Sequence, residues 1–300
     1  SGVFEGKTTG TPISVIVYNQ DQRSRDYGKI KDCYRPGHAD YTFDAKYGIR
    51  DYRGGGRSSA RETIGRVAAG AIAKKILKQL GIDLITFTRS IGDICIPETE
   101  YHYEDIAENM LYMPNNDYAK KASDYLESCM KNQDSSGGIV ECRVKGMPVG
   151  IGETVFDKLD ASLAKAVVSI GAVKGVEIGD GFEASKNHGS NNNDAFTCQN
   201  GSVIKKTNHA GGILGGMSDG SELILRAAFK PTPSISEEQQ TINTAFEDTT
   251  IAITGRHDPV VVPRAVVVVE SMAAITILDQ MMINMSAKMD ALEAFYCKTE

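Results

Sequence analysis

Arginine is concentrated in one short part of this chain. Six of the thirteen arginines lie between residues 35 and 66, although the chain as a whole carries a net charge of −6. Such clustering in an acidic protein indicates an anionic partner. The six are Arg35, Arg50, Arg53, Arg57, Arg61 and Arg66.

Arg57 stands where a phosphate could bind. It follows three consecutive glycines and directly precedes Ser58 and Ser59, where a helix is expected to begin. The free N–H groups of a helix start, the positive end of its dipole and a guanidinium fork would together hold a phosphate. The alternative is a solvated basic face in which the arginines pair with Asp40, Asp44 and Asp51. The spacing leaves both interpretations open.

Two later segments could bring the backbone close to a ligand. Residues 208–216 are rich in glycine, but they form neither the dinucleotide-binding Gly-x-Gly-x-x-Gly pattern nor a P-loop. Residues 230–234 are stiffened by two prolines and carry two hydroxyl groups. Close helix packing and a plain turn are the simpler interpretations of these two segments.

Three histidines lie in loops beside charged residues, where an imidazole could serve as a proton donor. They are His38, His209 and His257. The plainer interpretation is a hydrogen-bonded loop residue with no chemistry. No Ser/His/Asp or Cys/His arrangement and no metal-ligand spacing can be identified, so no metal site is expected.

Helices and strands are mixed along the whole chain, which predicts a single α+β domain over residues 1–300. The clearest helix opens with the capping box of Ser59 and Glu62 and stops at Gly81. Its expected apolar face is Ile64, Val67, Ala68, Ala71, Ile72 and Leu80. Further helices are expected at 117–131, 157–170 and 264–295, strands at 13–18, 84–91, 139–144, 173–178 and 223–229, an ordered loop at 33–57, and a mobile loop at 185–206.

Composition excludes several classes of protein. Hydrophobic residues make up 41% of the 300 residues and charged residues 24%, which is typical of a globular domain. The six scattered cysteines are typical of reduced thiols in a cytoplasmic protein. No segment is apolar enough to predict a membrane span. The net charge and the lack of interleaved stacking aromatics over a basic surface argue against nucleic-acid binding.

Four strings resemble motifs of the chorismate synthase family, in that family's order. They are Arg-Pro-Gly-His-Ala-Asp-Tyr at 35–41, Asp-Tyr-Arg-Gly-Gly-Gly-Arg-Ser-Ser-Ala-Arg-Glu at 51–62, Asn-His-Ala-Gly-Gly-Ile-Leu-Gly-Gly at 208–216 and Gly-Arg-His-Asp-Pro at 255–259. The resemblance runs from Ser1 to about Met281. It implies a β-α-β sandwich with helices packed between two antiparallel sheets, and a homotetramer.

The resemblance also implies an activity. Chorismate synthases convert 5-enolpyruvylshikimate 3-phosphate to chorismate by 1,4-elimination of phosphate in the shikimate pathway of aromatic amino acid biosynthesis. They require reduced FMN, although the reaction is redox-neutral overall. NADPH would be needed only by an enzyme that reduces its own flavin.

Site residues follow from the same motifs. Arg35 and Arg61 are expected to hold the anionic groups of the substrate, His38 to protonate the reduced flavin, and Asp258 to act near flavin N5. The residues expected to bind FMN are Arg57, Ser58, Ser59, Gly171, Ala172, Gly215, Lys230, Pro231, Thr232, Pro233, Ser234 and Arg256.

Family members carry several dozen residues before the position of Ser1, including a Gly-Glu-Ser-His motif that is not found here. The histidine of that motif is proposed to protonate the leaving phosphate. We therefore expect the chain as given to be impaired in turnover. A non-catalytic scaffold that binds flavin or phosphate is the alternative function.

Overall fold

A five-stranded antiparallel sheet forms the centre of the protein. The computed structural model describes residues 1–18, 30–53, 59–253 and 258–297. The strand order in the sheet is β4-β3-β5-β11-β6, and each neighbouring pair is antiparallel. The bounds are β3 Asp83–Ile91, β4 Ile94–Cys95, β5 Gly138–Lys145, β6 Val173–Ile178 and β11 Leu223–Phe229.

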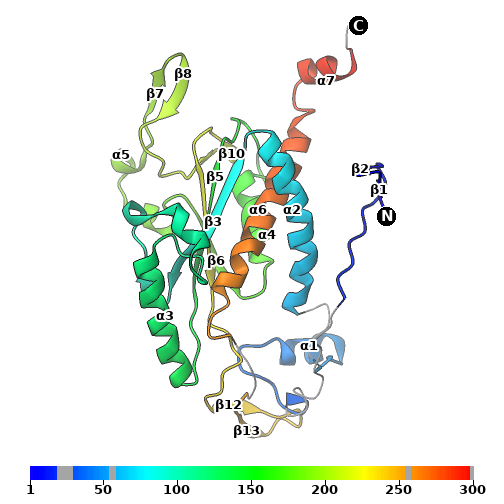
Figure 1. Ribbon diagram of the computed structural model, residues 1–300, viewed down its shortest axis with the longest axis vertical. Coiled ribbons are helices and arrows are strands. Elements are labelled where there is room, and N and C mark those ends of the chain that lie inside the picture. Colours follow the sequence, from blue (N-terminus) through cyan, green and yellow to red (C-terminus); the bar gives the residue numbers. More distant parts are fainter. Residues whose placement is uncertain (19–29, 54–58, 254–257, 298–300) are drawn as a thin grey trace.

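Three helices cover one face of this sheet (Figure 1). They are α2 (Thr63–Gln79), α4 (Leu159–Val168) and α6 (Val262–Asn284). Alternate residues of the strands, such as Val140 and Cys142, meet them in one continuous hydrophobic core. α6 is long and apolar enough to cross a membrane by length and composition alone. Ten of its 23 residues are buried in the protein, which is the pattern of a core helix.

Small residues let α2 and α6 approach closely. A Cβ atom added at Gly70 would lie 2.3 Å from the Cβ atom of Ser271 and 2.6 Å from its Cα atom. The face of α2 that is buried therefore carries Gly70, Ala73 and Leu77. The apolar face predicted for this helix was wrong in part, because Ile64, Ile72 and Leu80 are exposed.

We expect Gly70→Ala to lower the free energy of unfolding by about 1–3 kcal/mol, because the two helix backbones must separate to admit the methyl group. Gly65→Ala on the same helix is the matched control, since an added Cβ there meets nothing within 4 Å. That control should gain about 0.5–1 kcal/mol from the better helix propensity of alanine. Denaturant unfolding of both variants measures the difference, and equal stabilities would contradict the close packing.

The other face of the sheet carries a cluster of charges. The Glu141 side chain is 0% exposed, and its carboxylate accepts hydrogen bonds from Arg89, Arg143 and Arg226 at 2.6–2.7 Å. Burial raises the pKa of Glu141, but the charges and hydrogen bonds of Arg143 and Arg226 outweigh it and hold that pKa below its usual value. Glu98, whose side chain is 44% exposed, contacts the same three arginines from outside.

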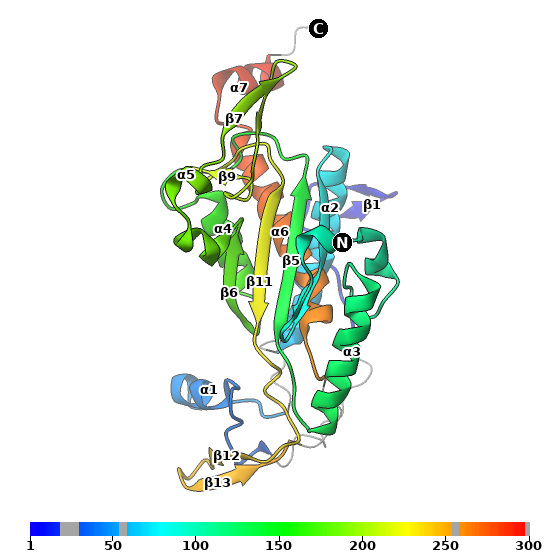
Figure 2. The ribbon, with the colours of Figure 1, turned by 90° about the vertical axis from the view of Figure 1, so that its left-hand side faces the viewer.

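Several small elements lie at the two ends of the sheet (Figures 1 and 2). Helix α1 (Asp40–Tyr47) and the hairpin of β12 (Gln239–Ile242) and β13 (Asp248–Ile251) lie at the end where β11 finishes. The ribbon of β9 (Ile213–Leu214) and β10 (Met217–Ser218) lies at the opposite end. The remaining elements are β1 Val3–Phe4, β2 Lys7–Thr8, η3 Ala60–Glu62, η4 Glu98–Glu100, η5 Tyr103–Ala107, α3 Asn116–Lys131, η6 Gly181–Lys186, α5 Gly189–Asn192, β7 Phe196–Gln199, β8 Ser202–Lys205 and α7 Met289–Tyr296.

The antiparallel sheet and its helices confirm the expected α+β class. The strands expected at 173–178 and 223–229 have the bounds of β6 and β11, and those at 84–91 and 139–144 fall within β3 and β5. The helices expected at 117–131 and 157–170 correspond to α3 and α4. Residues 1–18, with the β1–β2 ribbon, lie on the side of the helices opposite the five-stranded sheet (Figure 1).

Four local expectations were wrong. Residues 13–18 form no strand, because no described strand pairs with them and their apolar side chains are exposed. The loop expected at 33–57 contains α1. The helix expected at 264–295 is two helices, α6 and α7, with a break at 285–288. Ser59 caps η3 by accepting a hydrogen bond from Arg61 N, and Glu62 pairs with Arg66 rather than closing a capping box.

The segment 185–206 is more regular than a loop of that composition suggests. It contains α5 and the hairpin of β7 and β8. The Lys205 side chain at the base of this hairpin is buried, and its ammonium group lies 3.2 Å from Asp194 and 2.7 Å from Asp219. Motion of the segment stays a prediction.

Candidate functional site

The loop that carries Arg35 and His38 is a tight turn leading into α1. His38 N donates to the Arg35 carbonyl over 3.2 Å. Gly37 lies between them with φ +69°, in the left-handed region that favours glycine. A Cβ atom at Gly37 would lie 3.0 Å from the Cβ atom of Pro233, so the turn packs closely against the segment that follows β11.

The turn and that segment, residues 230–234, meet through two polar contacts. His38 Nε2 and the buried Ser234 Oγ lie 2.8 Å apart, and Lys230 Nζ donates to the Gly37 carbonyl. These contacts join residues separated by more than 190 positions in the sequence. The structure therefore brings together the histidine motif and the Lys-Pro-Thr-Pro-Ser segment.

A hollow of about 150 Å³ opens beside Ser234. Asp258, the other predicted catalytic residue, lines the same hollow, and its carboxylate pairs with Arg264 at 2.9 Å. Nearby, Thr232 Oγ1 is buried and has no hydrogen-bond partner among the residues that the structure describes. An unsatisfied buried hydroxyl is costly, so within the described part of the chain this hydroxyl still lacks a partner that it needs. The lining is Met130, Gln133, Asp134, Ser135, Ser234, Ile235, Ser236, Asp258 and Pro259.

Arg35 is held by an ion pair with Asp40. Its Nε and Nη2 atoms donate to the two carboxylate oxygens over 2.8 and 2.7 Å, and its backbone N–H donates to Asp40 as well. Burial raises the pKa of Asp40, but the hydrogen bonds and charge of Arg35 and the charge of Arg50 outweigh it and hold that pKa below its usual value. The Arg35 guanidinium is thus fixed in orientation, and within the described ranges its Nη1 atom makes no hydrogen bond.

Three other described arginines of the cluster, Arg50, Arg53 and Arg66, also have acidic partners. Arg50 contacts Asp40 and Asp44, and Arg53 contacts Asp51. Arg66 pairs with Glu62. The alternative interpretation of the cluster, pairing with nearby aspartates, therefore holds for Arg35, Arg50 and Arg53.

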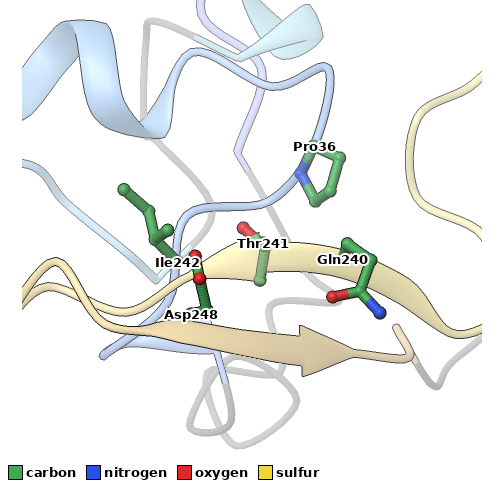
Figure 3. A pocket seen from close by; sticks show the side chains of 5 residues that line it. All are labelled: Pro36, Gln240, Thr241, Ile242 and Asp248. Carbon is green, nitrogen blue, oxygen red and sulfur yellow. The ribbon is translucent and has the colours of Figure 1, made fainter.

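A second hollow lies between Pro36 and the β12–β13 hairpin and has a volume of about 370 Å³ (Figure 3). It is lined by Pro36, Gln240, Thr241, Ile242 and Asp248. Thr241 Oγ1 donates to the Tyr34 carbonyl, so the hairpin contacts the loop directly before Arg35. This hollow extends the open surface around the histidine turn.

The remaining predicted site residues divide into four groups. The Gly171–Ala172 turn joins the histidine site, because Lys230 N donates to the Ala172 carbonyl over 3.0 Å. Gly215 does not, since it lies between β9 and β10 at the far end of the sheet (Figure 1). Ser59 and Arg61 lie at the start of α2. Arg57, Ser58 and Arg256, and His257 with them, lie outside the described residues.

Two residues of this site were not predicted to act there. Asp40 and Arg50 determine how Arg35 is oriented, yet both were considered only as members of a charged surface. The Arg-x₄-Asp spacing across a Pro-Gly turn was the signal available in the sequence for the Arg35–Asp40 pair. Nothing in the sequence marks Arg50, because three of its partners are backbone carbonyls, which any residue carries.

The chain is similar to known proteins along nearly its whole length. The family model described as chorismate synthase matches residues 1–282. The chain is 62% identical to a chorismate synthase of Agathobacter rectalis over 298 residues, which are 99% of this chain and 81% of that protein. It is also 62% identical to a chorismate synthase of Lachnoclostridium phytofermentans, over 99% of this chain and 82% of that protein. A solved structure titled "Crystal Structure of Chorismate Synthase" superposes with a TM-score of 0.75 at 30% identity, covering 98% of this chain and 80% of that one.

Proposed function

Because this chain belongs to the chorismate synthase family, a family of carbon–oxygen lyases, we propose that it eliminates phosphate from 5-enolpyruvylshikimate 3-phosphate to form chorismate. The observation that carries the proposal is the contact between His38 and Ser234 beside a hollow that Asp258 also lines. A 1,4-elimination needs an acid–base group and cationic stabilisation of a leaving phosphate. The histidine turn supplies both kinds of group within one loop.

The proposal includes reduced FMN as cofactor, a homotetrameric assembly, a cytoplasmic location and a place in aromatic amino acid biosynthesis. These parts rest on the family. NADPH is included only for an enzyme that reduces its own flavin.

The residues beside the histidine turn fit a cofactor with a phosphate tail. Lys230 supplies an ammonium group, Ser234 a hydroxyl, and the buried Thr232 Oγ1 lacks a partner among described residues. Reduced FMN would lend electron density to the substrate transiently and recover it. In that setting His38 would hold or donate a proton at Nε2, with Ser234 fixing the orientation of the ring.

Arg35 is the described residue best prepared to bind an anionic group of the substrate. Its bidentate pair with Asp40 fixes the guanidinium plane before a ligand arrives. Arg61, at the start of α2, is proposed as a second substrate-binding arginine.

Removing the Ser234 hydroxyl tests the orientation of His38. We expect Ser234→Ala to lower kcat/KM by about 2–10-fold, the effect of one hydrogen bond of about 0.5–1.5 kcal/mol. Ser236→Ala is the matched control, because Ser236 lines the same hollow but its hydroxyl donates to the Ile253 carbonyl. A control variant as impaired as Ser234→Ala would contradict a specific role for the His38–Ser234 contact.

The proposed reaction is tested by mixing the chain anaerobically with reduced FMN and 5-enolpyruvylshikimate 3-phosphate. The flavin spectrum and the absorbance of chorismate are followed together. Formation of chorismate supports the proposal. A change in the flavin spectrum without chorismate would favour the alternative of a non-catalytic scaffold, and the absence of both responses would refute flavin-dependent function for this chain.

A further inference from the structure

Arg50 lies at the centre of the loop that carries Arg35 and His38. Its side chain is only 8% exposed. Nη2 donates to three backbone carbonyls, those of Ile30, Lys31 and Cys33, at 2.7–3.2 Å. A guanidinium turned inward in this way is not presented to a substrate anion.

The same guanidinium also joins the loop to helix α1. Its Nη1 atom lies 3.3 Å from Asp40 and its Nε atom 3.4 Å from Asp44. Its plane lies over the ring of Tyr34, with 5.1 Å from the guanidinium carbon to the ring centre. Each of its three nitrogens thus contacts a different part of the loop or helix.

The β12–β13 hairpin holds this loop at a second set of points. Tyr34 N donates to the Ile242 carbonyl over 3.1 Å, and Thr244 N donates to the Asp32 carbonyl over 2.9 Å. With the bond from Thr241 to the Tyr34 carbonyl, these contacts fix the residues just before Arg35 (Figure 3). Main-chain contacts from the hairpin and side-chain contacts from Arg50 therefore act on the same short stretch.

We propose that Arg50 is a positioning residue, which orients the substrate-binding Arg35 and the His38 turn without touching the substrate. The proposal rests on the proposed function for the roles of Arg35 and His38. Arg50 acts on Arg35 through Asp40, whose carboxylate contacts both arginines. It acts on His38 through the turn in which the Arg35 carbonyl accepts the His38 N–H.

The chemistry of the contacts requires a guanidinium. Lysine carries its charge at one point and cannot span three carbonyls and two carboxylates together. Arg50→Lys should keep the electrostatic attraction to Asp40 and Asp44 but lose most of the bonds to the carbonyls. Arg50→Met should lose both.

The direct test uses the ligand-free chain. The NMR resonance of the Arg35 Nε–H group, identified by its loss in Arg35→Lys, reports the bond to Asp40. We expect this resonance to be protected from exchange in the unchanged chain, weakened in Arg50→Lys and lost in Arg50→Met. Lys46→Met is the matched control, because it removes a positive charge from exposed Lys46 on helix α1, which also carries Asp40 and Asp44, and it should leave the resonance unchanged.

Kinetics give the second readout. We expect Arg50→Met to lower kcat/KM at least 10-fold, mainly by raising KM for the phosphorylated substrate, with Arg50→Lys intermediate. If the role of Arg50 were purely structural, Arg50→Met would have a lower melting temperature. Below that temperature, its Arg35 resonance and its KM would be unchanged. That result would overturn the proposal, as would an Arg35 resonance in Arg50→Met equal to that in the control.

The proposed function and the positioning role of Arg50 would fail in different ways. If the unchanged chain forms no chorismate, the proposed function fails, and the Arg35 resonance still decides whether Arg50 orients that side chain. If Arg50→Met does not fold, Arg50→Lys decides the question, since it keeps the charge and much of the stem. An Arg35 resonance and KM equal to those of the unchanged chain would then refute the positioning role.

Discussion

Replacing His38 with alanine is expected to reduce turnover by about 10²–10⁴-fold, the range that a positioned acid–base group contributes. The Nε2 atom of this imidazole lies 2.8 Å from Ser234 Oγ. The described residues of the same loop contain no second histidine that could take over its role. The measurement is the rate of chorismate formation with saturating reduced FMN under anaerobic conditions. Circular dichroism should show that His38→Ala retains the helix content of the unchanged chain.

His102→Ala is the matched control for this prediction. The His102 side chain is 59% exposed and lies 3.8 Å from Asp105, away from the 230–234 segment. We expect its turnover to stay within about twofold of the unchanged chain, a change of less than about 0.5 kcal/mol. If His38→Ala were as active as this control, His38 would have no part in the reaction.

Glu141→Gln is expected to lower the free energy of unfolding by about 3–5 kcal/mol, because the neutral amide leaves three largely buried guanidinium groups without their central carboxylate. Glutamine has nearly the same shape as glutamate, so packing should change little. Glu98→Gln is the control: Glu98 contacts the same arginines, but its side chain is 44% exposed, and its loss should cost at most about 1 kcal/mol. Urea unfolding of both variants at neutral pH gives the comparison.

The contribution of Glu141 should depend on pH in one direction. Its pKa is lowered in the folded protein. Its stabilisation is therefore fully present above the ordinary pKa of a glutamate, about 4.3, and is lost as the pH falls through the lower folded-state value. The difference in stability between the unchanged chain and Glu141→Gln should shrink on acidification below about pH 4. A difference that grew on acidification would contradict this assignment of charge.

The sheet was predictable because its strands are short apolar runs bounded by turn residues. β11 is an example, since all of its residues except Arg226 are apolar. Residues 13–18 show the limit of the same signal. Their alternation is that of a strand, but a strand needs a hydrogen-bonded neighbour, and a local pattern carries no information about one.

Helix α1 was missed because nothing in its sequence forms an apolar stripe. Its first residue, Asp40, is instead fixed by ion pairs with Arg35 and Arg50. The break between α6 and α7 was missed for a related reason, since residues 285–288 contain neither glycine nor proline.

The candidate site was predictable as a set of motifs but not as an arrangement. The resemblance identified His38 and Ser234, and the structure adds that they touch. The resemblance could not indicate which arginines present their guanidinium to an anion, because this depends on where the acidic partner of each arginine lies in the fold. Arg50 illustrates this point, since it lies within the cluster yet turns toward backbone carbonyls.

The separation of 196 positions between His38 and Ser234 also has a consequence for how the protein is made. At a translation rate of about 5–20 residues per second, Ser234 is added about 10–40 s after His38. During that interval the histidine turn has neither Ser234 nor the β12–β13 hairpin to hold it. The site can therefore assemble only after the chain has been synthesised past Ser234 and the β12–β13 hairpin.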